Sequence, residues 1–454
     1  MARTGRTERS GSAGRTATSA APVTARGAAA RLLEQVLRDH RPLEAEDSAG
    51  PLAPLPPADR ARALRLARTT LRHLGRADAT LAPYLSSAPP DAVRMLLRLA
   101  VVEHFVEGAP AHAVVNEAVE QVRARRGGAR LAGMANAVLR RALATPPQDW
   151  AARPPERLPD WLRKRLVRAW GAAAVAAMEE AHAQGAPTDL TPRAPGDAAA
   201  LSAALGATLL PTGSLRLGRG AGQISTLPGH AEGAFWIQDA AAALPARLLA
   251  PRAGARVLDL CAAPGGKTLQ LAATGAAVTA LDISDMRLAR LHENLGRVGL
   301  PAQVVTADAL TWTPEAPFDA ILLDAPCTAT GTIRRHPDLP HVRGADALRS
   351  LVAVQAALID RALGWLAPGG RLVYATCSLL PEEGEDQIAA ALARHPGVVV
   401  LPVDVPGADP DWSAPGGGLR LRPDHWAAWG GIDGFFMAAL HRPGAGHDIA
   451  PQPR

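Results

Sequence analysis

The 454-residue sequence lacks the features that mark membrane, secreted and zinc-binding proteins. No apolar run is long enough to span a bilayer, and the opening stretch MARTGRTERSGSAGRTATSA has no hydrophobic core of the kind that secretory signals carry. The three cysteines show no Cys-x-x-Cys spacing, which argues against a disulfide framework and against a metal site. We therefore expect a cytoplasmic protein without a bound metal, and a disordered basic tail over residues 1–22.

Two nucleotide-binding motifs are also missing. Neither the Gly-x-Gly-x-x-Gly of dinucleotide-binding folds nor the Gly-x-x-x-x-Gly-Lys-Ser/Thr of P-loops occurs in the chain. The first absence disfavours an NAD-type oxidoreductase. Lysine is nearly absent too, because 47 of the 49 basic residues are arginines and the two lysines are Lys164 and Lys267.

Positive charge is concentrated at the N-terminal end. Residues 1–150 contain 22 arginines and 14 acidic residues, a balance of +8, which leaves −2 for the rest of a chain whose net charge is +6. A basic module beside a nearly neutral one indicates a polyanionic partner, most plausibly nucleic acid. The alternative is that these arginines form ordinary solvated helix faces.

The apolar spacing changes along the chain. Residues 23–145 show helical periodicity and no alternation of period two, so we expect an all-α domain there. A small α+β connecting domain is expected over residues 146–232. From residue 233 to 442, short apolar strands alternate with helices, which is typical of a mostly parallel sheet covered on both faces. Residues 443–454 are expected to form a C-terminal tail.

Acids and thiols follow the expected strands. In a parallel sheet the ligand crevice lies outside the carboxyl ends of the strands. A single acid at such an end is more often a turn residue, but so many of them at one edge by chance is improbable. The residues concerned are Asp259, Asp282, Asp308, Asp324, Cys327 and Cys377.

The stretch DLCAAPGGKT indicates a cofactor loop at the first of these strand ends. Gly265 and Gly266 let a backbone approach a ligand closely, and the following helix offers N–H groups to an anion. Lys267 adds a compact cation. An acid at the end of the second strand, Asp282, can accept hydrogen bonds from ribose hydroxyls. Together they predict a nucleoside-containing cofactor.

Cys327 and Cys377 are expected at the ends of neighbouring strands. A buried structural thiol is the usual interpretation of a lone cysteine, but catalytic thiols occupy partly exposed, polar places like these. His336 is the nearest candidate partner, so a protease-like Cys–His pair is poorly supported. Methylation of a pyrimidine at carbon 5 needs a nucleoside cofactor, a thiol and a carboxylate. These residues alone leave open which thiol is the nucleophile.

At these positions the chain resembles the RNA cytosine-C5 methyltransferases of the NOL1/NOP2/Sun group. The matching stretches are LDLCAAPGGKT, ALDIS, FDAILLDAPCTATGTIRRHPDL, LVYATCSLLPEEGEDQI and DGFFMAAL, and AHAVVNEAVEQV and MANAVLRRAL resemble helices of NusB-type domains. The resemblance implies a Rossmann-like class I methyltransferase domain, with a mostly parallel seven-stranded sheet, behind a NusB-like helical domain. It also implies that a monomeric enzyme methylates carbon 5 of a cytosine in 16S rRNA, free or in a small-subunit assembly particle.

The resemblance also assigns roles to individual residues. Cys377 matches the nucleophile, and Cys327 matches a second thiol that assists product release. Asp282, Asp308 and Asp324 match cofactor and site acids, with Asp324 also catalytic. The loop that binds S-adenosylmethionine comprises Cys261, Ala262, Ala263, Pro264, Gly265, Gly266 and Lys267.

The chain departs from the family pattern in two places. Alanines follow Gln238-Asp239 where Gln-Asp-x-Ser is frequent, and Ala307 precedes Asp308 where glycine is common. A competing hypothesis is an RNA-binding ribosome-assembly factor whose methyltransferase domain is silent.

Overall fold

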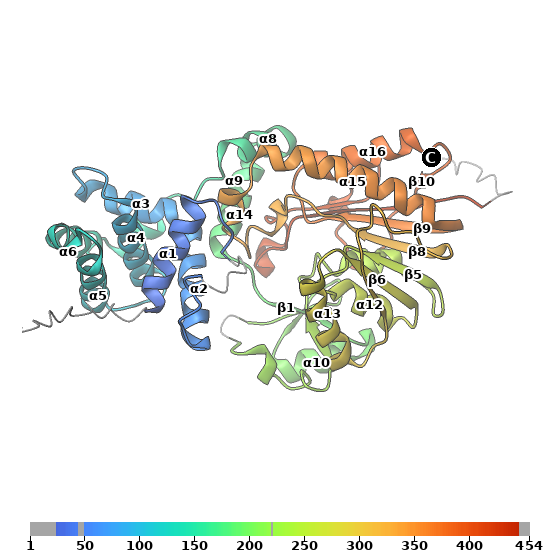
Figure 1. Cartoon of the computed structure of the whole chain (residues 1–454), viewed down its shortest axis with the longest axis horizontal. Coiled ribbons are helices and arrows are strands. Elements are labelled where there is room, and N and C mark those ends of the chain that lie inside the picture. The colour runs from blue at the N-terminus through green and yellow to red at the C-terminus, as the bar shows by residue number, and fades with distance from the viewer. Residues whose placement is uncertain (1–23, 44–49, 219–220, 445–454) are drawn as a thin grey trace, which may run out of the picture.

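A computed structural model describes residues 24–43, 50–218 and 221–444 (Figure 1). The expected tail over residues 1–22 lies outside the described residues, as do residues 445–454 of the expected C-terminal tail. Figure 1 shows a helical domain at one end of the molecule and a large sheet at the other. In the described part of the chain, no helix is long and apolar enough to cross a membrane.

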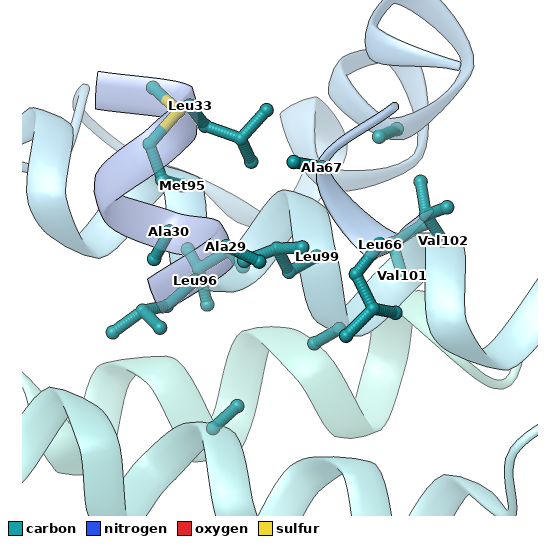
Figure 2. Packing of buried hydrophobic residues seen from close by; sticks show 14 of the residues in the cluster. Ala29, Ala30, Leu33, Leu66, Ala67, Met95, Leu96, Leu99, Val101 and Val102 are labelled. Atoms are coloured by element: carbon teal, nitrogen blue, oxygen red, sulfur yellow. The ribbon is translucent and has the colours of Figure 1, made fainter. Parts of the chain in front are cut away.

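The N-terminal domain is all helical, as predicted. Helix α4 lies at its centre, and its residues Met95 to Val102 are almost all buried because leucine, valine and alanine occupy nearly every position. Figure 2 shows Leu96 and Leu99 packed against the alanine-rich face of α1, where Ala29 and Ala30 allow close approach of the two helices. The helices are α1 (Ala25–Leu37), α2 (Pro57–Arg72), α3 (Leu74–Leu81), α4 (Asp91–Phe105), α5 (Ala111–Ala124) and α6 (Ala132–Ala142).

The region that follows combines helices with a small antiparallel sheet, which agrees with the expected α+β content. Its strands are arranged in the order β2-β3-β1-β4, and β4 lies beyond residue 232. The domain boundaries themselves stay a prediction. The elements are α7 (Pro147–Ala151), α8 (Asp160–Trp170), α9 (Ala172–Gln184), β1 (Asp189–Pro192), α10 (Ala198–Leu205), β2 (Thr208–Leu209), β3 (Leu215–Arg216) and β4 (Phe235–Ile237).

The large sheet has the strand order β10-β12-β9-β8-β5-β6-β7, and β11 pairs with β12. Strands β5 to β9 are parallel, whereas β10, β11 and β12 are joined by antiparallel pairing. The Rossmann-like prediction is confirmed, with one correction: the sheet has eight strands rather than seven. The strands are β5 (Arg256–Leu260), β6 (Ala277–Asp282), β7 (Gln303–Thr306), β8 (Phe318–Asp324), β9 (Leu366–Thr376), β10 (Val399–Val400), β11 (Leu419–Leu421) and β12 (Phe435–His441).

Helices cover both faces of this sheet because its central strands are apolar on both sides. Val257 and Leu322 face a core shared with α11, whereas Leu258 and Ile321 face a core shared with α15. Successive strand residues point to opposite faces, so this alternation divides the core into two layers. The helices are α11 (Leu244–Leu249), α12 (Gly266–Ala273), α13 (Asp285–Val298), α14 (Leu339–Val342), α15 (Ala345–Trp365) and α16 (Glu385–Arg394).

The helical domain contacts the segment that leads from β8 to α15. The Arg72 guanidinium donates to the carbonyl oxygen of Arg334 at 2.9 Å, and the amide of Leu43 donates to Asp338 Oδ2 at 3.0 Å. Val342 of α14 packs against the helical core. The segment that follows Cys327 is therefore held at its far end by the N-terminal domain.

Candidate active site

The structure brings the predicted acids and thiols to one edge of the large sheet. Asp282 ends β6 and Asp324 ends β8, while Cys377 directly follows β9. Asp308 and Cys327 lie in the turns after β7 and β8. All five strands run parallel, so their carboxyl ends meet at this edge, as the sequence predicted.

The loop over residues 261–267 is fastened to the end of β6 by Asp282. Its Oδ2 accepts the amide of Ala263 at 3.0 Å, and its Oδ1 accepts the amide of Ser284 at 3.0 Å. Asp282 is almost fully buried. A carboxylate has about four acceptor positions, so about two remain for a ligand. Its hydrogen bonds in this structure thus give Asp282 a role in shaping the loop that the sequence did not reveal.

Gly265 and Gly266 pack against protein rather than opening onto empty space. A Cβ on Gly265, whose φ is +104°, would lie 2.2 Å from Leu291 Cδ1 of α13. A Cβ on Gly266 would lie 3.2 Å from Gln238 Cδ. Gly265 is therefore required by its positive φ and its close approach to Leu291, whereas a side chain at Gly266 would crowd Gln238.

Two groups under the loop are not available as nucleophiles or free acids. Burial raises the pKa of the Cys261 thiol far above its ordinary value, so this thiol stays protonated. Burial also raises the pKa of Asp259 to about 7, although a 2.5 Å hydrogen bond from Thr268 Oγ1 opposes the shift. Within the described residues, Asp259 Oδ1 is buried without a hydrogen-bond partner.

Lys267 and Asp324 form an ion pair at the centre of the edge. Their Nζ and Oδ2 atoms are 2.7 Å apart, and the side chains are 11% and 28% exposed. Burial alone would lower the pKa of Lys267, but the charges of Asp324 and Asp259 outweigh it and raise that pKa. The ammonium is therefore charged and holds the Asp324 carboxylate in place, with the Phe435 ring centroid 5.4 Å from Nζ.

Cys327 and Cys377 lie side by side, with their sulfur atoms 3.5 Å apart. Cys327 is buried and Cys377 is half-buried. The hydrogen bond to Cys377 and burial both raise the pKa of Cys327 well above its ordinary value. The deeper burial of Cys327 favours its neutral form, and either sulfur can donate in this contact.

A fully buried acid that sequence reasoning missed, Glu383, supports the turn after β8. It accepts the amide of Thr328 at 2.9 Å and the side-chain amide of Gln355 at 3.0 Å, and also bonds the Thr328 hydroxyl. The backbone oxygen of Glu383 accepts from Tyr374 Oη at 2.8 Å. The sequence shows two adjacent acids in LLPEEGEDQI, but nothing there separates a buried acid from a surface one.

Arg335 is a second group that the sequence did not single out. Its Nε donates to Asp433 Oδ2 at 2.7 Å, and Asp433 is fully buried while Arg335 is 39% exposed. Burial would lower the pKa of Arg335, but Asp433, Asp239 and the sulfur of Cys377 together raise it. His336, by contrast, lines a cavity with Leu43 and Arg68 of the helical domain, away from the thiols.

The edge fits the nucleoside cofactor that the sequence predicted. Ile283 and Met286, beside Asp282, are 68% and 63% exposed, so they offer apolar surface to a purine base. Beneath the loop, the buried Asp259 Oδ1 is a polar atom without a partner among the described residues. Asp308 is half-buried and accepts the amide of Leu310 at 2.9 Å. Ala262 and Ala263 are buried, whereas Pro264 is exposed.

Comparison with known proteins identifies the family. Residues 246–441 match the model of 16S rRNA methyltransferase RsmB/F, and residues 23–144 match the NusB family. The chain is 38% identical over 448 residues to ribosomal RNA small subunit methyltransferase B of Xanthomonas campestris pv. campestris. The match covers 93% of this chain and 98% of the relative. The chain belongs to the RsmB/F family. This membership confirms the predicted enzyme class, an rRNA methyltransferase that uses S-adenosylmethionine.

Solved structures agree with a methyltransferase fold. A methyltransferase homolog protein from Pyrococcus horikoshii is 30% identical, with a TM-score of 0.53, and the match covers 62% of this chain and 93% of that protein. The crystal structure titled PH0851 has a TM-score of 0.67 at 22% identity and covers 92% of this chain and 98% of its own, which supports the fold alone. The roles predicted for single residues are not tested by these matches and stay predictions.

Proposed function

We propose that this RsmB/F-family enzyme methylates carbon 5 of a cytosine in 16S rRNA, with Cys377 as a covalent nucleophile. The observation that carries the proposal is the pair of thiols, 3.5 Å apart, beside the Lys267–Asp324 ion pair. The relative described above is named as a methyltransferase of small-subunit ribosomal RNA.

Carbon 5 of cytosine is a poor nucleophile, so the protein must activate the ring. The thiolate of Cys377 adds to carbon 6 and forms a sulfur–carbon bond, which transfers electron density to carbon 5. S-adenosylmethionine, when bound, supplies a methyl group on a positively charged sulfur. After carbon 5 has taken the methyl group, a base removes the carbon-5 proton, the ring double bond is restored, and Cys377 leaves as a thiolate.

Asp324 is placed to stabilise the ring while charge develops on it. Its carboxylate, held by Lys267, can hydrogen bond the exocyclic amine or the protonated ring nitrogen of cytosine. A donor or acceptor that is already fixed in a partly buried site costs little reorganisation when the charge appears. The ion pair therefore serves orientation and electrostatic stabilisation together.

Cys327 is placed to assist release of the product. Its thiol stays protonated and lies in hydrogen-bond distance of the Cys377 sulfur. A hydrogen bond from Cys327 stabilises the negative charge that Cys377 regains as the sulfur–carbon bond breaks. Without it, we expect the covalent adduct to persist.

The basic helical domain is the proposed RNA-binding module. Arg62 and Arg65 of α2 are 50% and 63% exposed. Binding to phosphates releases counterions and weakens steeply as salt rises. We propose a cytoplasmic enzyme that acts as a monomer, on free rRNA or on an assembly particle.

The competing hypothesis, an assembly factor with a silent enzyme, is disfavoured by the site itself. Both thiols, the ion pair and the glycine loop are present, the thiols contact each other, and Lys267 of the loop pairs with Asp324. A silent site carries no requirement to keep Lys267 in a chain that otherwise uses arginine almost throughout.

Trapping with 5-fluorocytidine RNA tests this proposal. Fluorine at carbon 5 cannot leave as a proton would, so the reaction stops at the covalent adduct. With S-adenosylmethionine, the wild-type protein and Cys327→Ala should form the adduct, and Cys377→Ala should not. On ordinary RNA, Cys327→Ala should transfer the methyl group and then stall as the adduct. An adduct that survives in Cys377→Ala contradicts the assignment of the nucleophile.

A further inference from the structure

A cavity of about 450 Å³ lies apart from the thiols, where the small sheet meets the methyltransferase domain. Its walls come from β1, the β2–β3 turn, β4, α11 and the C-terminal end of α12. Apolar surface from Trp236, Pro192 and Ala273 surrounds a small number of polar groups. Cavities of this size and mixed lining are common at ligand sites between domains.

Arg247 reaches this cavity without a counter-ion. Among the described residues, its guanidinium makes no hydrogen bond or ion pair, and its Nη1 is buried without a partner. Burial lowers the pKa of Arg247 to about 10, without an acidic side chain to oppose the shift. Arg216 in the adjacent sheet behaves differently, because Asp189 accepts two hydrogen bonds from it at 2.7 Å each. Arg247 is half-buried, and a charge partly withdrawn from water without a partner is costly, so an anion in the cavity would offset that cost.

Two hydroxyl groups buried in the wall of the same cavity also lack partners. Thr191 and Thr212 are 3% and 5% exposed, and their Oγ1 atoms lack partners among the described residues. Arg193, on the rim, adds an exposed cation that forms no ion pair in the described part of the chain. The guanidinium groups of Arg247 and Arg193, both without an acidic partner in the ranges that the structure describes, suit the several oxygens of a phosphate group.

We propose that this cavity binds a phosphate group, contributed by the backbone of the RNA substrate. The source of the phosphate rests on the proposed function, whereas the anion site itself does not. The exposed Pro195 and Pro406 on the rim provide the apolar surface on which a nucleotide attached to that phosphate can lie.

The cavity is connected to the cofactor loop through one side chain. Gln238 accepts from Trp236 Nε1 at 2.8 Å and donates to Gln270 Oε1 at 2.7 Å, and both partners line the cavity. The same Gln238 packs against Gly266 of the loop. The anion site thus lies at one end of α12 and the cofactor loop at the other, about 10 Å apart along the helix.

The test uses the full chain and three variants. Arg247→Gln removes the charge, Arg247→Lys restores a cation, and Arg252→Gln removes an exposed arginine nearby that does not line the cavity. Inorganic phosphate, compared with chloride at equal ionic strength, should raise the melting temperature of the wild type, Arg247→Lys and Arg252→Gln, but not of Arg247→Gln. Equal stabilisation of wild type and Arg247→Gln would overturn the site.

RNA binding and kinetics then identify the source of the phosphate. For Arg247→Gln, the slope of log affinity against log salt should fall by about 0.7 to 0.9, the value for one lost phosphate contact. KM for a 16S rRNA fragment should rise about tenfold with little change in kcat, as for one lost charge-assisted hydrogen bond. If phosphate binding is lost but the RNA slope and KM are unchanged, the RNA source is refuted. If the wild type methylates no RNA while phosphate binding still depends on Arg247, the proposed function fails and the anion site stands.

Discussion

Asp259 should make the apo-protein less stable as pH rises from about 5 to about 7. Its carboxyl is fully buried, and burial raises its pKa from an ordinary 3.8 to about 7. The folded state therefore holds a proton that the unfolded state releases. The resulting stability is complete below about pH 3.8 and is lost as pH rises towards 7.

The magnitude follows from the pKa values. A shift of one unit corresponds to about 1.4 kcal/mol, so a shift of about three units makes ionised Asp259 cost about 4 kcal/mol above pH 7. About pH 5 lies a little over one pH unit above the ordinary pKa of 3.8, so a little over one of the three pKa units already contributes to the cost at that pH. The variant Asp259→Asn avoids ionisation, and its amide oxygen can still accept from Thr268 Oγ1. Its stability relative to wild type should therefore improve by about 3 kcal/mol between about pH 5 and about pH 8.5.

Urea unfolding followed by circular dichroism at the two pH values measures this difference. Asp319→Asn is the control, because Asp319 is exposed at the start of β8 in the same sheet. It measures how far the loss of one exposed carboxylate changes the free energy of unfolding between the two pH values. A constant difference between Asp259→Asn and wild type across this pH range would refute the reasoning. It would mean that water or a rearranged neighbour reaches Asp259 Oδ1.

Three further substitutions test the loop, the ion pair and the helical core. Gly265→Ala should abolish S-adenosylmethionine binding in a calorimetric titration, because its Cβ would lie 2.2 Å from Leu291 Cδ1. Adding Leu291→Ala to the same chain should restore part of the binding. Binding at wild-type affinity in the Gly265→Ala variant would count against the packing argument. Lys267→Met should slow single-turnover methyl transfer by about 100-fold or more, because Asp324 loses its fixed cation; a wild-type rate would remove the ion pair from the mechanism. Leu96→Ala should lower the free energy of unfolding of the helical domain by about 2–5 kcal/mol in a urea titration, since Leu96 is fully buried. A loss below about 1 kcal/mol would show that the core collapses to fill the space.

The strand-end edge could be predicted because apolar strands and their following residues are local features of the sequence. Asp282, Asp324 and Cys377 could be placed together from the parallel arrangement alone. The short strands β10 and β11 escaped prediction, since two or three residues that pair only with β12 carry no periodic pattern of their own. The eighth strand is therefore a property of tertiary pairing.

Contacts between distant segments could not be predicted in the same way. Glu383 is buried because Thr328 and Gln355 surround it, and neither residue is near it in the sequence. The packing of Gln238 against Gly266 likewise joins segments that are far apart in the sequence. The sequence does not show which arginines have an acidic partner, so the lack of an acid beside Arg247 among the described residues appears only in the structure.

The central claim is that Cys377 forms the bond to carbon 6 of cytosine while Cys327 serves release. The most direct measurement is peptide mass spectrometry of the wild-type protein after reaction with 5-fluorocytidine RNA and S-adenosylmethionine, followed by nuclease and protease digestion. We predict that the methylated fluorocytidine nucleotide is attached to the peptide that contains Cys377. Attachment to the peptide that contains Cys327, or an unmodified pair of peptides in protein that methylates ordinary RNA, would contradict the account.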